Sequence, residues 1–260
     1  MSTRELSLKV LEQKLLKQEL TVQQINELKS DTRKGAYKLW ERHWNQQQKN
    51  EKERRRLRCM FRMEKFLWHK GYSNVAGVDE VGRGPLAGPV VAAAVILPDM
   101  LTQEDFHLLY GLNDSKKLTA TFREEMCRRI FSKASFVGIG MAEVEEIDYW
   151  NIYNASLLAM ERSVDQLEGA ADFLLVDGKT SLSISTPQQA LKKGDTKCAS
   201  VAAASVIAKV TRDNLMEKWE QKYPFYGLSQ HKGYATLEHK RAIKELGPTP
   251  LHRRSFLKNI

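Results

Sequence analysis

Apolar runs alternate with amphipathic stretches along the chain, and the pattern changes near Gly71. Beyond that residue, short apolar runs bounded by glycine, proline or polar residues predict strands at residues 75–79, 89–97, 136–142 and 172–177. Longer stretches with helical periodicity predict helices at residues 121–134, 151–167, 200–222 and 236–246. The first two strands are close enough in the sequence to pair antiparallel. Strands alternating with helices indicate an α/β domain.

Before Gly71 the sequence is helical in pattern. Three residue pairs along the chain fit capping boxes at helix N-termini: Ser2/Glu5, Thr21/Gln24 and Thr121/Glu124. Three aromatic residues fall at helical spacing: Tyr37, Trp40 and Trp44. Such a stripe is more typical of side chains packed in the hydrophobic core than of a surface that binds a ligand.

Residues 46–70 are polar and then strongly basic. The basic positions include Arg54, Arg55, Arg56, Arg58 and Arg62, and an apolar stripe accompanies them at Leu57, Phe61 and Trp68. Two interpretations stay open, a helix that grips phosphates and an ordinary solvated helix face. We therefore predict a helical, basic N-terminal extension at residues 1–70 and a main domain at residues 71–260.

Charge and composition narrow the class of protein. The 260 residues include 41 Lys and Arg against 32 Asp and Glu, a formal charge of +9, which favours a polyanionic partner and nucleic acid before a membrane. The three cysteines, Cys59, Cys127 and Cys198, are widely spaced without a CxxC pair, so they indicate neither a disulfide framework nor a zinc site. The polar N-terminus and the lack of a long apolar run favour the cytoplasm.

An acidic pair interrupts the first apolar run. Asp79 and Glu80 stand just before the Gly82-Arg83-Gly84 turn, and buried carboxylates are costly unless a cation or hydrogen-bond donors compensate them. Successive strand residues point to opposite faces, so we expect the glycine turn to end the strand if both acids serve one site. Glycines there also bring bare N–H groups close to an anionic ligand. The alternative is a hairpin turn with solvated acids.

Two further acids follow apolar or glycine-rich segments. Asp177 ends the run Phe173-Leu174-Leu175-Val176, and Asp195 follows Gly194 just before the alanine-rich helix. Taken singly, each is more typical of a cap or a turn. Ligands in open α/β sheets gather at strand ends, so four carboxylates could converge there on hard divalent cations.

Six motifs in order resemble the ribonuclease HII family, the bacterial type 2 ribonuclease H. They are DEVGRGPLAGPVVAAAV at residues 79–95, NDSKKL at 113–118, LLVDG at 174–178, AAASVIAKVTRD at 202–213, HKGYATLEH at 231–239 and HRRSF at 252–256. The resemblance implies a ribonuclease-H-like α/β fold with a central mixed β-sheet flanked by helices and a small helical C-terminal part. The helical N-terminal extension lies outside these motifs.

The resemblance also implies an activity. It is endonucleolytic cleavage of the RNA strand of RNA–DNA hybrids, and incision 5′ of single ribonucleotides embedded in duplex DNA, with 3′-hydroxyl and 5′-phosphate products. The family uses two Mg²⁺ or Mn²⁺ ions, held by carboxylates that match Asp79, Glu80, Asp177 and Asp195. One cation lowers the pKa of the attacking water while the other stabilises the leaving 3′-oxygen. We expect a monomer that acts on such duplexes in replication and ribonucleotide excision repair, without a membrane partner.

Selecting the right phosphate requires sensing the 2′-hydroxyl that distinguishes RNA from DNA. In the family the glycine turn, here Gly82, Arg83 and Gly84, does this with a tyrosine that matches Tyr234. A larger side chain at Gly84 should block the approach of the sugar. Lys116 is the next candidate for a phosphate contact. On its own, Tyr234 would be more typical of a buried aromatic residue, and Lys116 of a solvated surface.

Asp213 competes with Asp195 as the fourth carboxylate, since the sequence lets either face the site. Asp195 is preferred because it begins the helix and matches the family position better. Three histidines, His231, His239 and His252, lack the spacing of a zinc site and are interpreted as structural or adjacent to substrate.

Other functions fit less well. The glycines of GRGPLAGP superficially resemble a nucleotide-binding loop, but the segment has neither the Walker ending nor the Rossmann spacing. A basic, non-catalytic hybrid-binding protein is the main alternative, and the intact acidic set argues against it. A transposase-like or junction-cleaving nuclease would share fold and metals, but would not need Gly-Arg-Gly and Tyr234 to read a 2′-hydroxyl.

Overall fold

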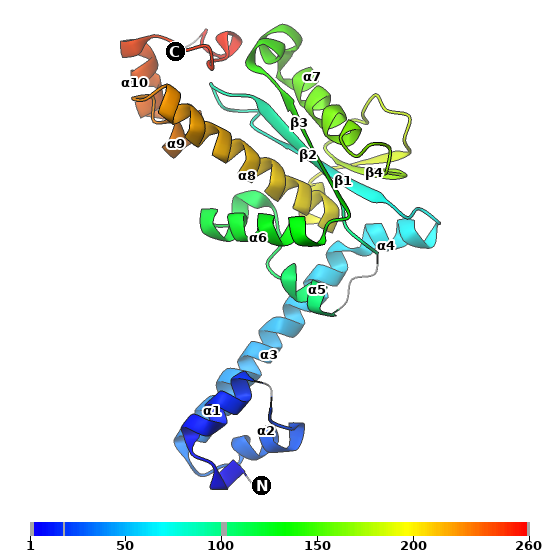
Figure 1. The fold of residues 1–260 in the computed structure, drawn as a ribbon, viewed down its shortest axis with the longest axis vertical. Helices are drawn as coiled ribbons and strands as arrows, with labels where there is room; N and C mark the ends of the chain where they lie inside the picture. Colours follow the sequence, from blue (N-terminus) through cyan, green and yellow to red (C-terminus); the bar gives the residue numbers. More distant parts are fainter. Residues whose placement is uncertain (1–2, 18, 100–102, 259–260) are drawn as a thin grey trace. The chain divides into compact units, whose positions relative to one another are not determined.

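The computed structural model describes residues 3–17, 19–99 and 103–258 (Figure 1). The chain divides into two compact units, Met1–Arg56 and Leu57–Ile260. The predicted boundary at residues 70 and 71 stays a prediction. Ser2, one half of the first predicted capping box, lies outside the described residues.

The N-terminal unit is helical. Its elements are η1 (Thr3–Glu5), α1 (Leu8–Leu16), α2 (Val22–Lys29) and most of α3 (Lys34–Met60). The capping box of Thr21 and Gln24 is confirmed at the start of α2, where each side chain binds the other residue's backbone N–H. Leu11, Leu28 and Ala36 are fully buried and form the core of this unit.

The prediction that the aromatic stripe belongs to the core is wrong for two of its three members. Tyr37 and Trp44 are 45% and 50% exposed, whereas Trp40 is partly buried against the leucine core of this unit. The three rings follow one another along α3 with centroid separations of 5.6 and 5.9 Å. A surface aromatic row and a core row share helical spacing, so periodicity alone does not separate them.

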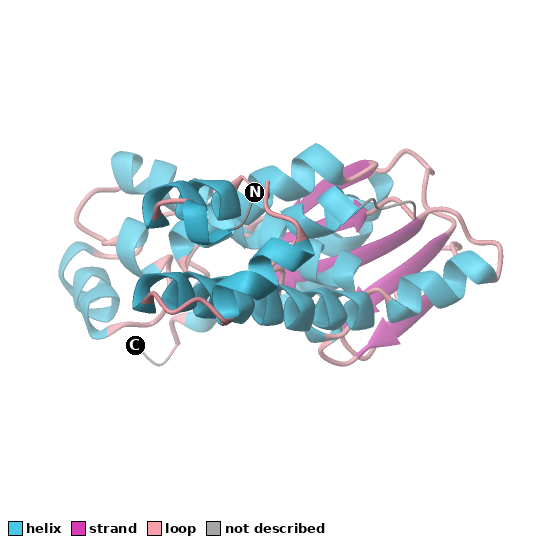
Figure 2. Cartoon of the chain, turned by 90° about the horizontal axis from the view of Figure 1, so that it is seen from below, coloured by secondary structure: helices cyan, strands magenta, loops and turns pink. Residues whose placement is uncertain are grey.

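The second unit is built on one mixed sheet, whose strands lie side by side (Figure 2). In its described residues the strand order is β3-β2-β1-β4-β5, with bounds β1 Val75–Val81, β2 Val90–Ile96, β3 Phe136–Ala142, β4 Phe173–Asp177 and β5 Gln188–Leu191. The predicted antiparallel pairing of the first two strands is confirmed, and β1 also pairs parallel with β4. β1 and β2 are central strands whose residues are buried on both faces of the sheet, which explains their almost unbroken apolar runs.

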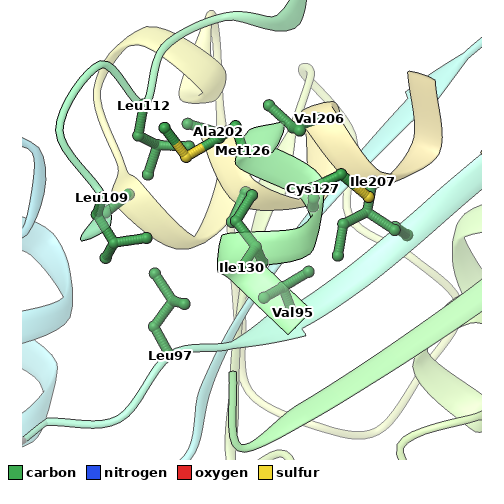
Figure 3. Close-up of a cluster of buried hydrophobic side chains, with 14 of the residues drawn as sticks. Val95, Leu97, Leu109, Leu112, Met126, Cys127, Ile130, Ala202, Val206 and Ile207 are labelled. Atoms are coloured by element: carbon green, nitrogen blue, oxygen red, sulfur yellow. The ribbon is translucent and has the colours of Figure 1, made fainter. Parts of the chain in front are cut away.

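Helices cover both faces of this sheet (Figure 1). The elements are α4 (Arg62–His69), α5 (Gln103–Leu108), η2 (Ser115–Lys117), α6 (Ala120–Lys133), α7 (Val144–Asp165), η3 (Gly194–Thr196), α8 (Ala199–Lys222), α9 (Leu228–His231), α10 (Leu237–Leu246) and η4 (Arg254–Phe256). Alternate residues of β2 face opposite layers: Val95 packs with α6 and α8, and Ala94 packs with α7. Figure 3 shows the first layer, where Val95 and Leu97 meet Met126, Ile130 and Ile207. The predicted central mixed sheet flanked by helices is confirmed.

The C-terminal helices form a small layer of their own. Leu228, Ala242 and Ile243 pack with Met216 of α8 and with Leu86 from the loop between β1 and β2. This layer places the end of the chain against the loop that follows the acidic strand end. The predicted small helical C-terminal part is confirmed.

Two local predictions need correction. Helix α6 begins after Thr119, whose side chain accepts the Phe122 N–H at 3.3 Å, so the Thr121/Glu124 capping box is wrong. The sequence predicts a helix that begins at residue 151, but helix α7 begins earlier, at Val144. Asn151, at φ 67° and ψ 164°, forms a kink within this helix. The Asn151 side chain caps the second segment by accepting the Tyr153 N–H at 2.9 Å.

Candidate metal centre and glycine turn

Two neighbouring strands carry three carboxylates to one end of the sheet. The parallel register sets Val78 opposite Val176, so that Asp79 and Asp177 follow at the same level. One carboxylate oxygen from each of Asp79, Glu80 and Asp177 lies within 4.8 Å of the other two. The expectation that the glycine turn must end the strand for the acids to share a site is wrong, because β1 runs regularly through Val81.

Burial makes this cluster electrostatically costly. The pKa of Asp79 is raised well above its usual range by burial, and then by the charges of Glu80 and Asp177. Burial also raises the pKa of Glu80 to about 7, with Asp177 adding to the shift and Arg83 opposing it. The Arg83 guanidinium lies 3.4 Å from a Glu80 oxygen and is itself half-exposed. Clustered hard oxygen ligands with unbalanced negative charge fit a divalent cation, which supplies the missing positive charge.

Hydrogen bonds from the protein hold the carboxylates of Asp79 and Asp177 in place. The Glu80 N–H donates to Asp79 Oδ1 at 2.8 Å, and the Gly194 N–H donates to Asp177 Oδ1 at 2.6 Å. Ser205 of α8 also bonds to Asp79 and favours its charged form. The Ser205 hydroxyl lies 2.9 Å from that of Ser115, which connects the cluster to the NDSKKL segment. Sequence reasoning missed both serines, because nothing in their spacing shows that they meet.

Asp195 lies in η3, ahead of α8, whose N-cap is Cys198, so the expectation that it begins the helix is wrong. It is not a member of the three-carboxylate cluster of the described residues. Its pKa is raised by burial and by the charges of Asp114 and Asp177, and Lys116 lowers it. These electrostatic interactions place Asp195 and Lys116 in the surroundings of Asp177.

The Asp213 carboxylate forms ion pairs outside the acidic cluster. Its carboxylate binds Lys209 Nζ at 2.6 Å and the Arg123 guanidinium at 3.3 Å, both partly buried. Arg123 in turn donates to the carbonyls of Ser115 and Leu118, so the pair anchors the NDSKKL segment to α8. This arrangement gives Asp213 a structural role and supports Asp195 as the proposed fourth ligand.

The two glycines of the turn have different surroundings. Gly82 has φ +98°, and a Cβ there would lie 2.4 Å from Arg212 Nε. Gly84 is exposed, and a Cβ there would meet only the Tyr234 ring, at 3.7 Å. Tyr234 is 42% exposed, so it is not the buried aromatic residue that its type alone suggests. Arg83, between the two glycines, connects the turn to the acidic cluster through Glu80.

A groove of about 680 Å³ extends from the acidic cluster along α7. Glu80, Asp177 and Arg83 line it together with Tyr153 of α7. A positively charged border completes the lining, formed by Lys179, Lys192 and Lys193. A groove lined by clustered carboxylates and by several cations is suited to a phosphate-containing ligand with a divalent cation.

Two of the three histidines, His239 and His252, share a hydrogen bond, and the His231 ring stacks on the His239 ring with a centroid separation of 4.3 Å. The Thr249 N–H donates to His252 Nδ1 at 2.9 Å, which assigns the His252 proton to Nε2. His252 Nε2 lies 3.0 Å from His239 Nε2, and His239 Nδ1 donates to the Tyr234 carbonyl at 2.9 Å. Both rings are therefore neutral, and burial lowers the pKa of His252 to about 4. Their structural interpretation agrees with this arrangement.

None of the helices in the described part of the chain combines the length and apolar character needed to cross a membrane.

Comparisons with known proteins agree with this architecture. The family model described as ribonuclease HII matches residues 76–259, and the ribonuclease HII N-terminal domain model matches residues 7–68, which the six motifs do not reach. Ribonuclease HII of Bacillus licheniformis is 47% identical over 232 residues, covering 89% of this chain and 88% of that protein. Ribonuclease HII of Ruminiclostridium cellulolyticum is 44% identical over 246 residues, covering 94% of each.

A solved structure, the ribonuclease H2 from Pyrococcus horikoshii OT3, is 28% identical with a TM-score of 0.60 and covers 70% of this chain and 93% of that one. The family models and the curated relatives span both units of the chain. The chain belongs to the ribonuclease HII family and is a ribonuclease H, a hydrolase.

Proposed function

We propose that the chain is an endonuclease that hydrolyses the RNA strand of RNA–DNA hybrids and incises 5′ of single ribonucleotides embedded in duplex DNA. The products carry 3′-hydroxyl and 5′-phosphate ends. One observation carries the proposal: in a ribonuclease HII family member, Arg83 of the glycine turn lines the same groove as the clustered carboxylates of Glu80 and Asp177. The carboxylates and the turn that we propose to read the sugar thus border one groove.

Asp79, Glu80 and Asp177 would hold the divalent cation, with Asp195 as the proposed fourth ligand. When bound, two Mg²⁺ or Mn²⁺ ions supply Lewis-acid chemistry, lowering the pKa of water and neutralising charge on the leaving oxygen. The protein's own contribution is orientation. The N–H groups of Glu80 and Gly194 and the hydroxyl of Ser205 hold the carboxylates in place before substrate arrives.

Phosphate binding is assigned to cations around the groove. Arg83 is half-exposed beside Glu80, so it can reach a phosphate on the carboxylates, and Lys116 is exposed near Asp195. Lys179, Lys192 and Lys193 border the continuation of the groove and would follow the strand away from the cut. These contacts carry affinity and no sequence preference, which suits an enzyme that acts at many sites.

Recognition of RNA is assigned to the turn. The space over Gly84 admits the sugar, Tyr234 supplies a ring or hydroxyl against it, and exposed backbone groups of residues 82–84 meet the 2′-hydroxyl. Such a reader works on one ribonucleotide as well as on a hybrid, because it senses a single sugar. We accordingly propose a monomeric, cytoplasmic enzyme that serves replication and ribonucleotide excision repair.

The test is cleavage of a labelled DNA duplex that contains one ribonucleotide, compared with an all-DNA duplex and an RNA–DNA hybrid. Each is incubated with Mg²⁺, Mn²⁺ or a chelator. We expect metal-dependent incision at the 5′ side of the ribonucleotide, cleavage of the hybrid, and none of the all-DNA duplex. Binding without cleavage in either metal would replace the proposal by a non-catalytic hybrid-binding role, and equal cleavage of all-DNA would indicate a different nuclease.

A further inference from the structure

Arg253, near the C-terminus, is fully buried against the loop between β1 and β2. Its guanidinium donates to four carbonyls of that loop: Gly82 at 2.6 Å, Arg83 at 3.1 Å, Pro85 at 2.8 Å, and Gly88 at 2.7 and 2.9 Å. All of its bonds thus go to backbone oxygens of residues 82–88. One side chain from 165 residues along the chain fixes the path of the whole turn.

No carboxylate pairs directly with this guanidinium among the described residues, although the charge of Asp148 acts on it from a distance. In the described part of the chain, neither Arg253 nor the fully buried Arg212 forms an ion pair, and Arg212 donates to the carbonyls of Ala87, Pro89 and Lys232. Burial lowers the pKa of Arg253 to about 9, and Arg212 adds to the shift. Apolar side chains in the same space are often no less stabilising than buried charges. The benefit of two buried cations must therefore lie in the conformation of the carbonyls that they bind.

The planar trans peptide determines what that conformation presents. A carbonyl and the N–H of the following residue point in opposite directions. With the carbonyls of Gly82 and Arg83 turned to Arg253, the N–H groups of Arg83 and Gly84 point away from it. The described residues offer no acceptor to either N–H, and both residues are exposed.

The same rule is visible one step further along the loop. The Pro85 carbonyl binds Arg253, and the next N–H, that of Leu86, donates to the Gly233 carbonyl at 2.8 Å. Gly233 directly precedes Tyr234. Arg253 thereby also helps to fix the turn relative to the segment that carries the tyrosine.

We propose that Arg253 is a positioning residue for ribose recognition: it holds the Gly82 and Arg83 carbonyls so that the Arg83 and Gly84 N–H groups are preset toward the 2′-hydroxyl and adjacent phosphate. The inference rests on the proposed function, because it assumes that the turn reads the sugar. Preset donors bind without first ordering the loop, and so they favour the ribonucleotide over its deoxy analogue. If Arg253 served only stability, its replacement would weaken binding of both duplexes by the same factor.

The experiment measures affinity for a duplex with one ribonucleotide and for the all-DNA duplex, in Ca²⁺ in place of Mg²⁺, with intact strands verified on a gel. The variant is Arg253→Lys, which keeps the charge but loses the guanidinium fork that spans four carbonyls. The ratio compared is the dissociation constant for the all-DNA duplex divided by that for the duplex with one ribonucleotide. We expect this ratio to fall about tenfold, which is the scale on which a pair of neutral hydrogen bonds acts.

Arg162→Lys is the matched control. Arg162 also makes several bonds, to the Met141 carbonyl and to Glu146 at 2.7 and 2.8 Å, but it lies on α7 away from the loop. Thermal melting ranks the two variants for stability. We expect Arg162→Lys to lower the melting temperature and leave the affinity ratio unchanged. A folded Arg253→Lys protein with the wild-type ratio overturns the positioning role, whereas a wild-type ratio near one refutes the proposed function itself.

A measurement on the wild-type protein applies even if Arg253→Lys fails to fold. Residue-resolved amide exchange should find the Arg83 and Gly84 N–H groups unprotected in the free protein, since they have no acceptor. The duplex with one ribonucleotide should protect both at least tenfold more than the all-DNA duplex does. Equal protection by the two duplexes, or none by either, contradicts the inference.

Discussion

Replacing Gly84 by alanine separates recognition from folding. The added Cβ would meet only Tyr234 Cε1, at 3.7 Å, an ordinary van der Waals contact, and Gly84 has no positive φ. The methyl group would stand on the exposed face where the sugar is proposed to lie. We therefore expect Gly84→Ala to fold normally and to lose activity.

The sizes of both effects follow from this geometry. Replacing glycine at a compatible backbone position removes freedom from the unfolded chain and stabilises by about 0.4–1 kcal/mol. For a domain of this size that is a rise in melting temperature of roughly 1–4 °C. A displacement of substrate by about 1 Å costs on the order of a hundredfold in rate. The variant should thus melt no lower than wild type while kcat/KM on a single-ribonucleotide duplex falls about a hundredfold.

Gly82→Ala is the contrasting substitution two residues away. Gly82 has φ +98°, and its Cβ would lie 2.4 Å from Arg212 Nε and 2.8 Å from the Pro89 carbonyl oxygen. The backbone strain alone costs on the order of 1–3 kcal/mol, and displacing a buried guanidinium adds to it. We expect a fall in melting temperature of roughly 5–10 °C.

The assay combines thermal melting with steady-state cleavage of a fluorescent duplex that contains one ribonucleotide. If Gly84→Ala cleaves at the wild-type rate, the sugar does not approach Gly84. If it melts as far below wild type as Gly82→Ala, the two glycines do not divide their roles as the geometry indicates. Either result refutes the reasoning.

Three further predictions have separate measurements. Asp79→Asn should abolish cleavage and largely spare hybrid binding. It should also raise the melting temperature in chelator, because it removes one buried charge from beside Glu80 and Asp177. Unchanged turnover in saturating Mg²⁺ would exclude Asp79 from the mechanism. Deleting residues 1–56 retains the buried Leu57 and Phe61 and removes Arg54, Arg55 and Arg56 of the basic segment. If these three arginines bind phosphates, the slope of log affinity against log salt should become shallower by about 0.9 per lost contact, and an unchanged slope would show that they make no phosphate contact. The pKa of His252 is lowered to about 4 in the folded state from an ordinary value of about 6.5, so the unfolded chain binds the proton first and stability falls as pH drops from about 6.5 to 4. Across that range wild type should lose about 3 kcal/mol more than His252→Asn in urea titrations, and parallel curves would show that His252 is not held neutral.

The sheet was predictable where its strands are apolar. Residues 75–79 and 89–97 match β1 and β2, because central strands buried on both faces carry almost unbroken apolar runs. Residues 136–142 match β3, an edge strand whose alternate residues are buried. Strand β5, Gln188–Leu191, was not predicted, because it is a short edge strand whose residues are polar or half-buried. Its pairing with β4 comes from tertiary structure and leaves no periodic signal in four residues.

The acidic cluster was predictable for a different reason. Asp79, Glu80 and Asp177 are charges at the ends of apolar runs, an inconsistency that a sequence retains where function requires it. The role of Arg253 had no such signal. Its partners are carbonyl oxygens, which every residue carries, and they lie 165–171 residues away in the sequence.

The backbone conformation of residues 82–84 makes this turn depend on the C-terminal layer. Its conformation has φ +98° at Gly82 and turns the Gly82 and Arg83 carbonyls toward the buried Arg253 side chain. Buried carbonyls without donors would cost about 1–3 kcal/mol each, and the turn would relax to bond them elsewhere. Arg253 supplies those donors, and the helices α9 and α10 with η4 bury the region around it. A change that loosens this layer should therefore alter the turn before it unfolds the sheet, because β1 keeps its ladders with β2 and β4 whether or not the loop carbonyls are bound.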